Sequence, residues 1–433
     1  MQTYSPEIAQ QIHDKQQTTA CRRRFWGFWR VLALCVGLVS LVFASFGAGV
    51  ATMWAIGPEL RRTVAAVAPG VVDTRKQQTR EQRIGLLWEV WDILQAEYLN
   101  PQTLDDQKMI YGAVAGAVGT LGDPHTAFVE PAPAAIIEED MQGSFEGIGA
   151  TVDMVDGRVV IVRPLPNSPA LKAGLQAGDI VLAVDDQSLE GRTLAEAIGL
   201  IRGPRGTVAR LRVLRKGSDG PFIVPVTRAR VELPIVESRM LEGRIAYLRL
   251  AEFNALSGDR LHTALEELMG SEPTGLVLDL RGNPGGYLQM AIDIASEFLP
   301  RGTVVVAEQE RGRERQEVHV QGRGLALDVP LVVLVDGASA SASEIVAGAI
   351  RDSGRGKLVG EKTYGKGSVQ NTHRLEDGSS LRVTIAKWYL PKGQNLDGNG
   401  IEPDIVVTVT QEDVSAGTDP QLDRAIAYLQ KGE

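Results

Sequence analysis

The stretch LVVLVDGASASASEIVAGAI, residues 331–350, decides the fold of this chain. Its first five residues are an apolar run typical of a buried strand, and its last seven indicate the start of a helix. An alternating Ala/Ser turn at 338–343 joins them. Because N–H groups at a helix N-terminus favour negative charge, a serine here either caps the helix or acts as an acyl-transfer nucleophile. The residues alone do not choose among Ser339, Ser341 and Ser343.

Around this stretch, residues 232–433 alternate between apolar runs and helical patterns. The alternation predicts an α/β domain in which helices cover a sheet. We expect strands at 245–250, 275–280, 303–307, 331–335, 357–359, 379–384 and 405–408. We expect helices at 258–269, 287–298, 342–351 and 420–429.

Residues 143–231 predict a smaller domain of short strands, with one helix at 194–201. Apolar runs at 148–152, 159–162, 180–184, 209–214 and 222–226 alternate there with turn residues. The sequence Gly147-Ile148-Gly149 opens the domain, and PNSPA (166–170), AGL (173–175) and GDI (178–180) follow it. This order resembles a PDZ domain, whose glycine-flanked loop binds a terminal carboxylate while the peptide adds as a strand. A lone Gly-Ile-Gly would instead be a structural turn.

The N-terminal part predicts a membrane anchor. Residues 31–56 carry no charge and, at about 1.5 Å each, exceed a hydrocarbon core of roughly 30 Å. Arginines before the segment predict a cytoplasmic tail and an exported remainder. The small residues at 44–51 would also suit a signal peptidase, so cleavage is the alternative. Helical patterns at 82–99 and 104–121 predict two amphipathic helices that pack on the chain's own core or on a second copy in a homodimer.

Composition limits the classes of function. A net charge of −9 argues against a protein that binds nucleic acid.

We divide the 433 residues into a cytoplasmic tail (1–30), a transmembrane anchor (31–56), a juxtamembrane and helical region (57–142), a PDZ domain (143–231) and a catalytic core (232–433).

Two further loops carry chemistry. DLRGNPGG at 279–286 follows an apolar strand, and its glycines let N–H groups approach an anion, either a phosphate or a transient oxyanion. TYGKGSVQ at 363–370 places Lys366 between two glycines, and on a strand Lys366, Ser368 and Gln370 would share one face. A buried lysine has a lowered pKa and can accept a proton as a neutral amine. The plain alternative is a solvated surface lysine.

The histidines argue against a Ser-His-Asp triad. There are five, and none stands in a motif that assigns it a role, although His373 lies nearest in sequence to the lysine loop. They show no metal-ligand spacing. The two cysteines, Cys21 and Cys35, lie at or inside the predicted anchor, so the remainder can form no disulfide.

Taken together, these motifs resemble the C-terminal processing peptidases, or tail-specific proteases. The resemblance covers residues 86–409 and includes GDPHT (122–126) and GIEPD (400–404) besides the loops above. It implies a crotonase-like α/β core with an inserted PDZ domain, and a serine endopeptidase that cleaves unstructured C-terminal tails outside the cytoplasmic membrane, in a periplasm or at a cell surface. No metal or organic cofactor is expected.

The resemblance also assigns roles to residues. Ser341 becomes the nucleophile, Lys366 the general base and Gln370 its support. Backbone N–H groups of Gly286 (or Gly285) and Ala342 form the oxyanion hole, and Gly147, Ile148 and Gly149 the peptide-binding loop. Arg202 is a candidate sensor of peptide binding, against the alternative of a surface arginine.

The chain departs from the family pattern before the serines, where Asp336-Gly337-Ala338 replaces an asparagine and two glycines, and at His125, where an aromatic residue is common. The first departure puts the loop geometry around Ser341 in question.

Two other classes of protein stand as alternatives. One is an anchored PDZ scaffold with an inactive core, and the other is a trypsin-like PDZ protease, whose PDZ domain usually follows the catalytic part.

Overall fold

The computed structural model describes residues 79–432. The predicted cytoplasmic tail and membrane anchor lie outside this range. Among the described helices, none combines the length and apolar character that crossing a membrane requires. The chain divides into one unit up to Leu104 and a second from Asp105 onwards.

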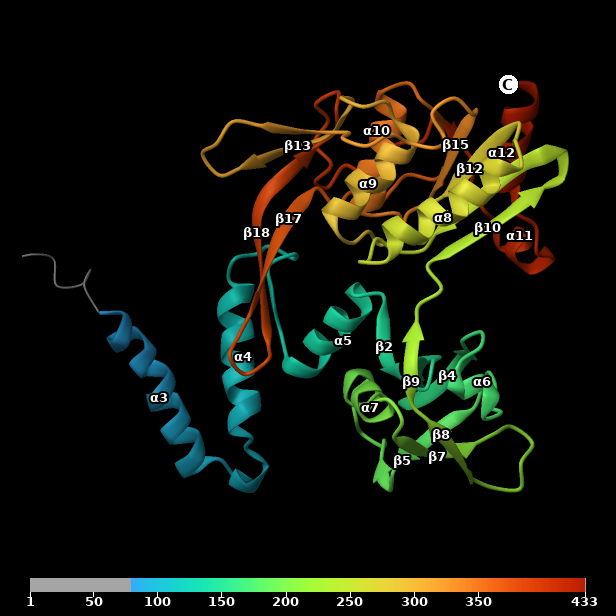
Figure 1. Ribbon diagram of the computed structural model, residues 1–433. Coiled ribbons are helices and arrows are strands. Elements are labelled where there is room, and N and C mark those ends of the chain that lie inside the picture. The colour runs from blue at the N-terminus through green and yellow to red at the C-terminus, as the bar shows by residue number, and fades with distance from the viewer. Residues whose placement is uncertain (1–78, 433) are drawn as a thin grey trace, which may run out of the picture. The chain divides into compact units, whose positions relative to one another are not determined.

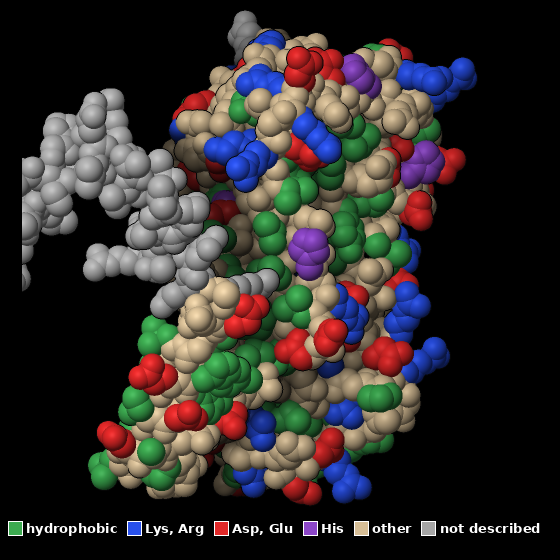
Figure 2. Space-filling view, turned by 90° about the vertical axis from the view of Figure 1, so that its left-hand side faces the viewer, with side chains coloured by type: hydrophobic (Ala, Val, Ile, Leu, Met, Phe, Trp, Pro, Cys, Tyr) green, Lys and Arg blue, Asp and Glu red, His purple; other side chains and the backbone are tan. Residues whose placement is uncertain are grey.

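The first unit contains helix α3 (Arg80–Glu97) and a short 3-10 helix (Pro101–Thr103). Thr79 starts α3 with a capping box, in which the Thr79 hydroxyl accepts from the Gln82 N–H and the Gln82 side chain accepts from the Thr79 N–H. The helix predicted at 82–99 is therefore present. Most of its large apolar side chains are exposed, whereas Trp91 is buried. Figure 2 shows exposed hydrophobic side chains among charged ones on one face of the protein.

The second unit begins with α4 (Asp106–Gly119), capped by Asp105, and continues through β1 (Ala127–Val129) and α5 (Pro131–Met141). The sequence predicted α4, but β1 and α5 were not predicted. Strand β1 has three residues and gives almost no periodicity to detect, and α5 buries none of its residues, so it carries no apolar stripe.

The next segment is a sheet of short strands around its own apolar core. Its order is β3-β4-β5-β7-β8, with β6 paired to β5. The elements are β3 (Ala150–Val155), β4 (Arg158–Pro164), α6 (Pro169–Lys172), β5 (Ile180–Val184), β6 (Gln187–Ser188), α7 (Leu194–Ile201), β7 (Val208–Leu214) and β8 (Phe222–Thr227). Strand β2 (Ser144–Gly147) enters this region and pairs antiparallel with β9 (Ala229–Glu232), which leaves it. Every strand run predicted for this region overlaps an observed strand.

A six-stranded sheet, in the order β10-β11-β12-β15-β16-β19, forms the larger core. All neighbours are parallel except β10 and β11. Its strands are β10 (Val236–Leu241), β11 (Ile245–Leu250), β12 (Gly275–Asp279), β15 (Leu331–Val335), β16 (Lys357–Gly360) and β19 (Ile405–Val406). Its helices are α8 (Ser257–Gly270), α9 (Leu288–Phe298), α10 (Ala342–Asp352), α11 (Gln411–Ala416) and α12 (Pro420–Lys431).

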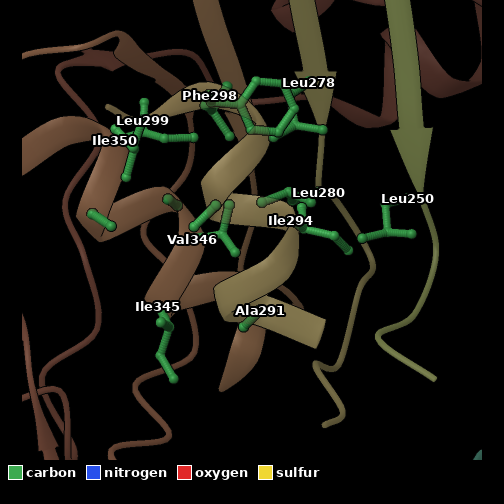
Figure 3. Packing of buried hydrophobic residues seen from close by; sticks show 14 of the residues in the cluster. Leu250, Leu278, Leu280, Ala291, Ile294, Phe298, Leu299, Ile345, Val346 and Ile350 are labelled. Atoms are coloured by element: carbon green, nitrogen blue, oxygen red, sulfur yellow. The ribbon is translucent and has the colours of Figure 1, made fainter. Parts of the chain in front are cut away.

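Alternate residues of these strands are buried on opposite faces of the sheet. Leu248, Leu278 and Val333 face one side and pack in a single cluster with apolar side chains of α8, α9 and α10. Figure 3 shows side chains of α9 and α10 meeting those of β11 and β12. Tyr247 and Val332 face the other side, where α12 covers them. Burial on both faces explains the nearly continuous apolar runs that predicted these strands.

A second sheet carries the lysine loop. It runs β1-β18-β13-β14, and β17 pairs antiparallel with β18. Its remaining strands are β13 (Val304–Glu310), β14 (Gln316–His319), β17 (Ser368–Arg374) and β18 (Ser380–Tyr389) (Figure 1). Strands β14 and β17 were not predicted, because polar residues dominate both.

Candidate active site

The serine turn leaves β15 and enters α10 through a strained residue. Ser341 precedes the helix with φ 55° and ψ −113°, a conformation that non-glycine residues rarely adopt. Backbone strain of this kind costs about 1–3 kcal/mol and persists only where the surroundings impose it. A sharp strand-to-helix turn is how α/β-hydrolases expose a nucleophilic serine.

Burial separates the three serines of the turn. The hydroxyl of Ser339 donates to the Leu280 carbonyl (2.8 Å), and that of Ser343 donates to the Asn283 carbonyl (2.9 Å). Both of these serines are fully buried, whereas Ser341 is partly exposed. Ser339 and Ser343 therefore tie the turn to the glycine loop, and Ser341 is the one that a substrate can reach.

The glycine loop lies directly against this turn. A Cβ atom on Gly285 would stand 2.8 Å from the Ser341 Cβ and 2.9 Å from the Ala342 nitrogen, so only glycine fits there. The Gly285 N–H donates to the Asn283 side-chain oxygen (2.9 Å). Within residues 79–432, the N–H groups of Gly286 and Ala342 have no hydrogen-bond acceptor. These two donors, rather than Gly285, are free to stabilise an oxyanion.

Asp336 joins the serine turn to the same loop. Its carboxylate accepts from the Gly282 N–H and from the N–H groups of Ala338 and Ser339, each at 3.0 Å. The residue that departs from the family pattern thus holds both loops through backbone donors.

Glu344 connects the serine turn to the lysine loop, and the sequence did not single it out. One carboxylate oxygen accepts from the N–H groups of Ser341 (2.8 Å) and Lys366 (2.9 Å). The other accepts from the Thr363 hydroxyl (2.6 Å) and the Gly365 N–H (2.8 Å). The backbone nitrogens of Ser341 and Lys366 therefore lie within two hydrogen-bond lengths of each other, on either side of a fully buried carboxylate.

The surroundings of Lys366 favour a neutral amine. Burial lowers the pKa of Lys366 below the usual lysine value of 10.5, and the positive charge of Arg382 on β18 lowers it further. Gln370 follows on β17, where its amide donates to Ser368 (2.8 Å) and to Thr384 (3.2 Å). The side-chain oxygen of Gln370 is the atom that would accept from the lysine amine, and support of Lys366 by Gln370 stays a prediction.

Gly147 ends β2, Ile148 and Gly149 connect it to β3, and β3 is an edge strand of its sheet. Gly149 has φ 74°, and a Cβ there would stand 2.6 Å from the Ser168 Cβ. The Ala170 N–H donates to the Ile148 carbonyl (2.7 Å), so the PNSPA segment closes over the loop. This arrangement leaves an edge strand beside a glycine loop, which suits addition of a peptide as a further strand.

Arg202 ends α7 beside this loop and is not a free surface arginine. Its guanidinium donates to Glu139 (2.6 Å) and Asp140 (2.8 Å), the acidic pair at the end of α5. It also lies over the Phe145 ring, 4.3 Å from the ring centre. Arg202 thus joins the loop-bearing segment to a helix outside it.

The other polar candidates do not converge on the serine. His373 is exposed on β17 opposite Leu381, and His262 pairs with Glu297. Among the described residues, no group of His, Cys, Asp or Glu is arranged to hold a metal ion. Glu344 and Arg382 are neighbours of the site that the sequence did not single out, whereas Asp336 was noted only as a departure from the family pattern. A helix-starting glutamate three residues after a serine indicates only a capping box.

Comparison with known proteins places these features in a family. Residues 244–407 match peptidase family S41, and residues 160–215 match a PDZ domain. A carboxy-terminal-processing protease of Bartonella bacilliformis is 36% identical over 358 residues, covering 81% of each chain. One of Synechocystis is 35% identical, covering 79% of this chain and 82% of the relative. Carboxy-terminal processing protease CtpB of Bacillus subtilis is 32% identical, covering 81% and 72%.

Replacing the buried carboxylate should separate the two loops. Glu344→Gln removes the charge and turns an amide N–H₂ toward backbone donors, so we expect a loss of about 3 kcal/mol in the free energy of unfolding. Peptide hydrolysis should fall at least about tenfold in the protein that remains folded. Urea unfolding and cleavage rates measure the two effects.

The matched control is Glu402→Gln, because Glu402 is exposed and its ion pair is with exposed Lys362. Its stability should stay within about 0.5 kcal/mol of the parent protein. Hydrolysis at the parent rate in folded Glu344→Gln would show that the carboxylate does not hold the site.

Proposed function

Because this chain belongs to the carboxy-terminal processing proteases of peptidase family S41, we propose that it is an anchored serine endopeptidase with a Ser341–Lys366 dyad. Its substrates would be extracytoplasmic proteins with unstructured C-terminal tails. The observation that carries the proposal is the buried carboxylate of Glu344, which accepts from the backbone N–H groups of Ser341 and Lys366. The two loops meet at this carboxylate, beside the glycine loop.

The proposed reaction uses these groups in turn. Neutral Lys366 takes the proton of the Ser341 hydroxyl as the serine oxygen attacks the peptide carbonyl. The N–H groups of Gly286 and Ala342 stabilise the negative oxygen of the tetrahedral intermediate. Protonated Lys366 then gives its proton to the leaving amine, and an acyl-enzyme remains. Water, deprotonated by Lys366, releases the acyl group and restores the Ser341 hydroxyl.

The PDZ domain supports a preference for chain ends. We propose that the loop at Gly147, Ile148 and Gly149 binds the terminal carboxylate of the tail while the tail pairs with β3. Arg202 would then report binding to the rest of the protein through α5, because its guanidinium already joins the PDZ region to Glu139 and Asp140.

Placement at the membrane rests on the sequence. The uncharged stretch 31–56 would anchor the chain, with the catalytic part outside the cytoplasm. The division into an inserted PDZ domain (143–231) and a crotonase-like catalytic core (232–433) belongs to the same proposal. So does a homodimer formed through the amphipathic helices.

Removing either member of the dyad should abolish cleavage. We expect Ser341→Ala and Lys366→Ala to lose at least about 1,000-fold in kcat/KM on a protein with an unstructured C-terminal tail, because both groups act in the same proton transfer. Mass spectrometry of the products measures the loss. Lys362→Ala, at an exposed lysine four residues before Lys366, is the control and should retain activity. Full cleavage by either dyad variant would refute the mechanism.

The pH profile should report the pKa of Lys366. A general base works only when it is neutral, so kcat/KM should rise with pH through a value below the ordinary 10.5 of lysine. Arg382→Gln removes a positive charge near the amine and raises its pKa. The rise in kcat/KM should then move to higher pH, and activity above both pKa values should be unchanged.

Two further variants test the charge. Arg382→Lys should keep the parent profile because it keeps the positive charge. Arg374→Gln, on the exposed part of β17, should leave the profile in place, since Arg374 pairs with Glu138. An unmoved profile in Arg382→Gln would exclude Arg382 as a cause of the low pKa.

Arg202 should couple tail binding to cleavage. Arg202→Ala breaks the contacts with Glu139 and Asp140, so stimulation of cleavage by a C-terminal tail should fall about two- to fivefold. The measurement is the ratio of cleavage rates for the same substrate with and without its tail. Arg205→Ala, at an exposed arginine in the next loop, is the control. An unchanged ratio in Arg202→Ala would remove Arg202 from the coupling.

A further inference from the structure

Arg281, within the DLRGNPGG loop, is held from two sides by carboxylates that are far apart in sequence. Its backbone and side-chain N–H groups donate to Asp279, which ends β12. Its Nη1 and Nη2 atoms each donate to one oxygen of Asp419, both at 2.8 Å. The two guanidinium edges are thus paired by carboxylates, the geometry in which an arginine is most precisely oriented.

Asp419 belongs to the C-terminal helix and is itself fixed there. It is the N-cap of α12, and its side chain accepts from the Leu422 N–H (3.0 Å). Two residues further on, buried Gln421 accepts from Arg281 (3.1 Å) and donates to the Val407 carbonyl (2.8 Å). Burial alone would raise the pKa of Asp419, but the hydrogen bonds and charge of Arg281, together with backbone N–H groups of Leu422 and Gln421, lower it, so this carboxylate stays ionised.

Five residues lead from Arg281 to Gly286 in the proposed oxyanion hole, and hydrogen bonds hold this segment in place. The next residue, Gly282, donates its N–H to Asp336, and Asn283 donates its side-chain amide to the Leu250 carbonyl (2.9 Å). Gly285 and Gly286 follow directly. A displacement of Arg281 would therefore move a loop in which Gly285 already touches Ser341.

We propose that Asp419 is a positioning residue for peptide hydrolysis, which acts through Arg281 to hold the glycine loop in register with Ser341. The N-terminus of α12 thereby becomes part of the catalytic apparatus, although it lies in the last helix of the chain. The inference rests on the proposed oxyanion role of Gly286 and goes beyond it, since the family assignment gives α12 no part in the reaction.

Asp419→Asn is the decisive variant in the full-length protein. Asparagine is as good an N-cap as aspartate, so α12 keeps its cap while Arg281 loses one of its two charged partners and keeps Asp279. We expect kcat to fall on the order of tenfold and KM to change less than about twofold, because oxyanion contacts form in the transition state. Asp423→Asn, an exposed site on the same helix with the same change of charge, should retain the parent kcat.

Cleavage rates per folded molecule distinguish a variant that unfolds from one in which the glycine loop is displaced. Urea unfolding gives the folded fraction of each variant, and a loss of activity that this fraction fully explains would overturn the proposal. So would a parent kcat in folded Asp419→Asn, or an effect on KM alone. If Asp419 acts through Arg281, the double variant Arg281→Ala with Asp419→Asn should have the kcat of Arg281→Ala, and additive losses would contradict the proposal.

The test of Asp419 can fail independently of the test of the Ser341–Lys366 dyad. An active Ser341→Ala variant would refute the dyad whatever Asp419→Asn does. An inactive Ser341→Ala variant beside a fully active, folded Asp419→Asn variant would leave the dyad intact and refute only the role of Asp419.

Discussion

The site depends on one buried carboxylate. Glu344 is fully removed from solvent, and an ion in that position is costly unless donors surround it. Three backbone N–H groups and one hydroxyl do so, and they come from both loops that carry the proposed dyad. The loops can satisfy the charge only in one mutual arrangement. The desolvation of Glu344 therefore fixes the distance between the backbones of Ser341 and Lys366, although Glu344 takes no part in the proposed chemistry.

The glycine loop is held to the serine turn by the same means. Asp336, Ser339 and Ser343 each bond backbone groups of the glycine loop, and the closeness of Gly285 to Ser341 excludes any side chain. Most of these bonds involve backbone atoms, so the geometry follows from loop conformation rather than from a string of reactive side chains. That explains how aspartate at 336 can hold this turn: its carboxylate oxygens accept from N–H groups on both loops.

The sequence predicted what local patterns encode. Strands β11 and β15 coincide with the expected ranges, because burial on both faces makes apolar runs that need no knowledge of their neighbours. Strand β17 was missed because polar residues dominate it. Its pairing with β18 depends on tertiary contacts that the local sequence does not encode. Family resemblance selected Ser341, and the structure adds a physical reason, the burial of Ser339 and Ser343. Glu344 and Arg281 could not be found this way, because the contacts that set them apart are with distant residues, Lys366 for Glu344 and Asp419 for Arg281.

A nearby carboxylate would ordinarily make Lys366 a poor base. An ion pair raises the pKa of a lysine and keeps it protonated, whereas the proposed reaction needs a neutral amine. Both oxygens of Glu344 already accept two hydrogen bonds each, one of them from the Lys366 backbone N–H itself. The carboxylate thus holds the lysine through its backbone N–H. Burial and the positive charge of Arg382 act on the amine and lower its pKa, so a single glutamate brings the base into place while the amine keeps a lowered pKa.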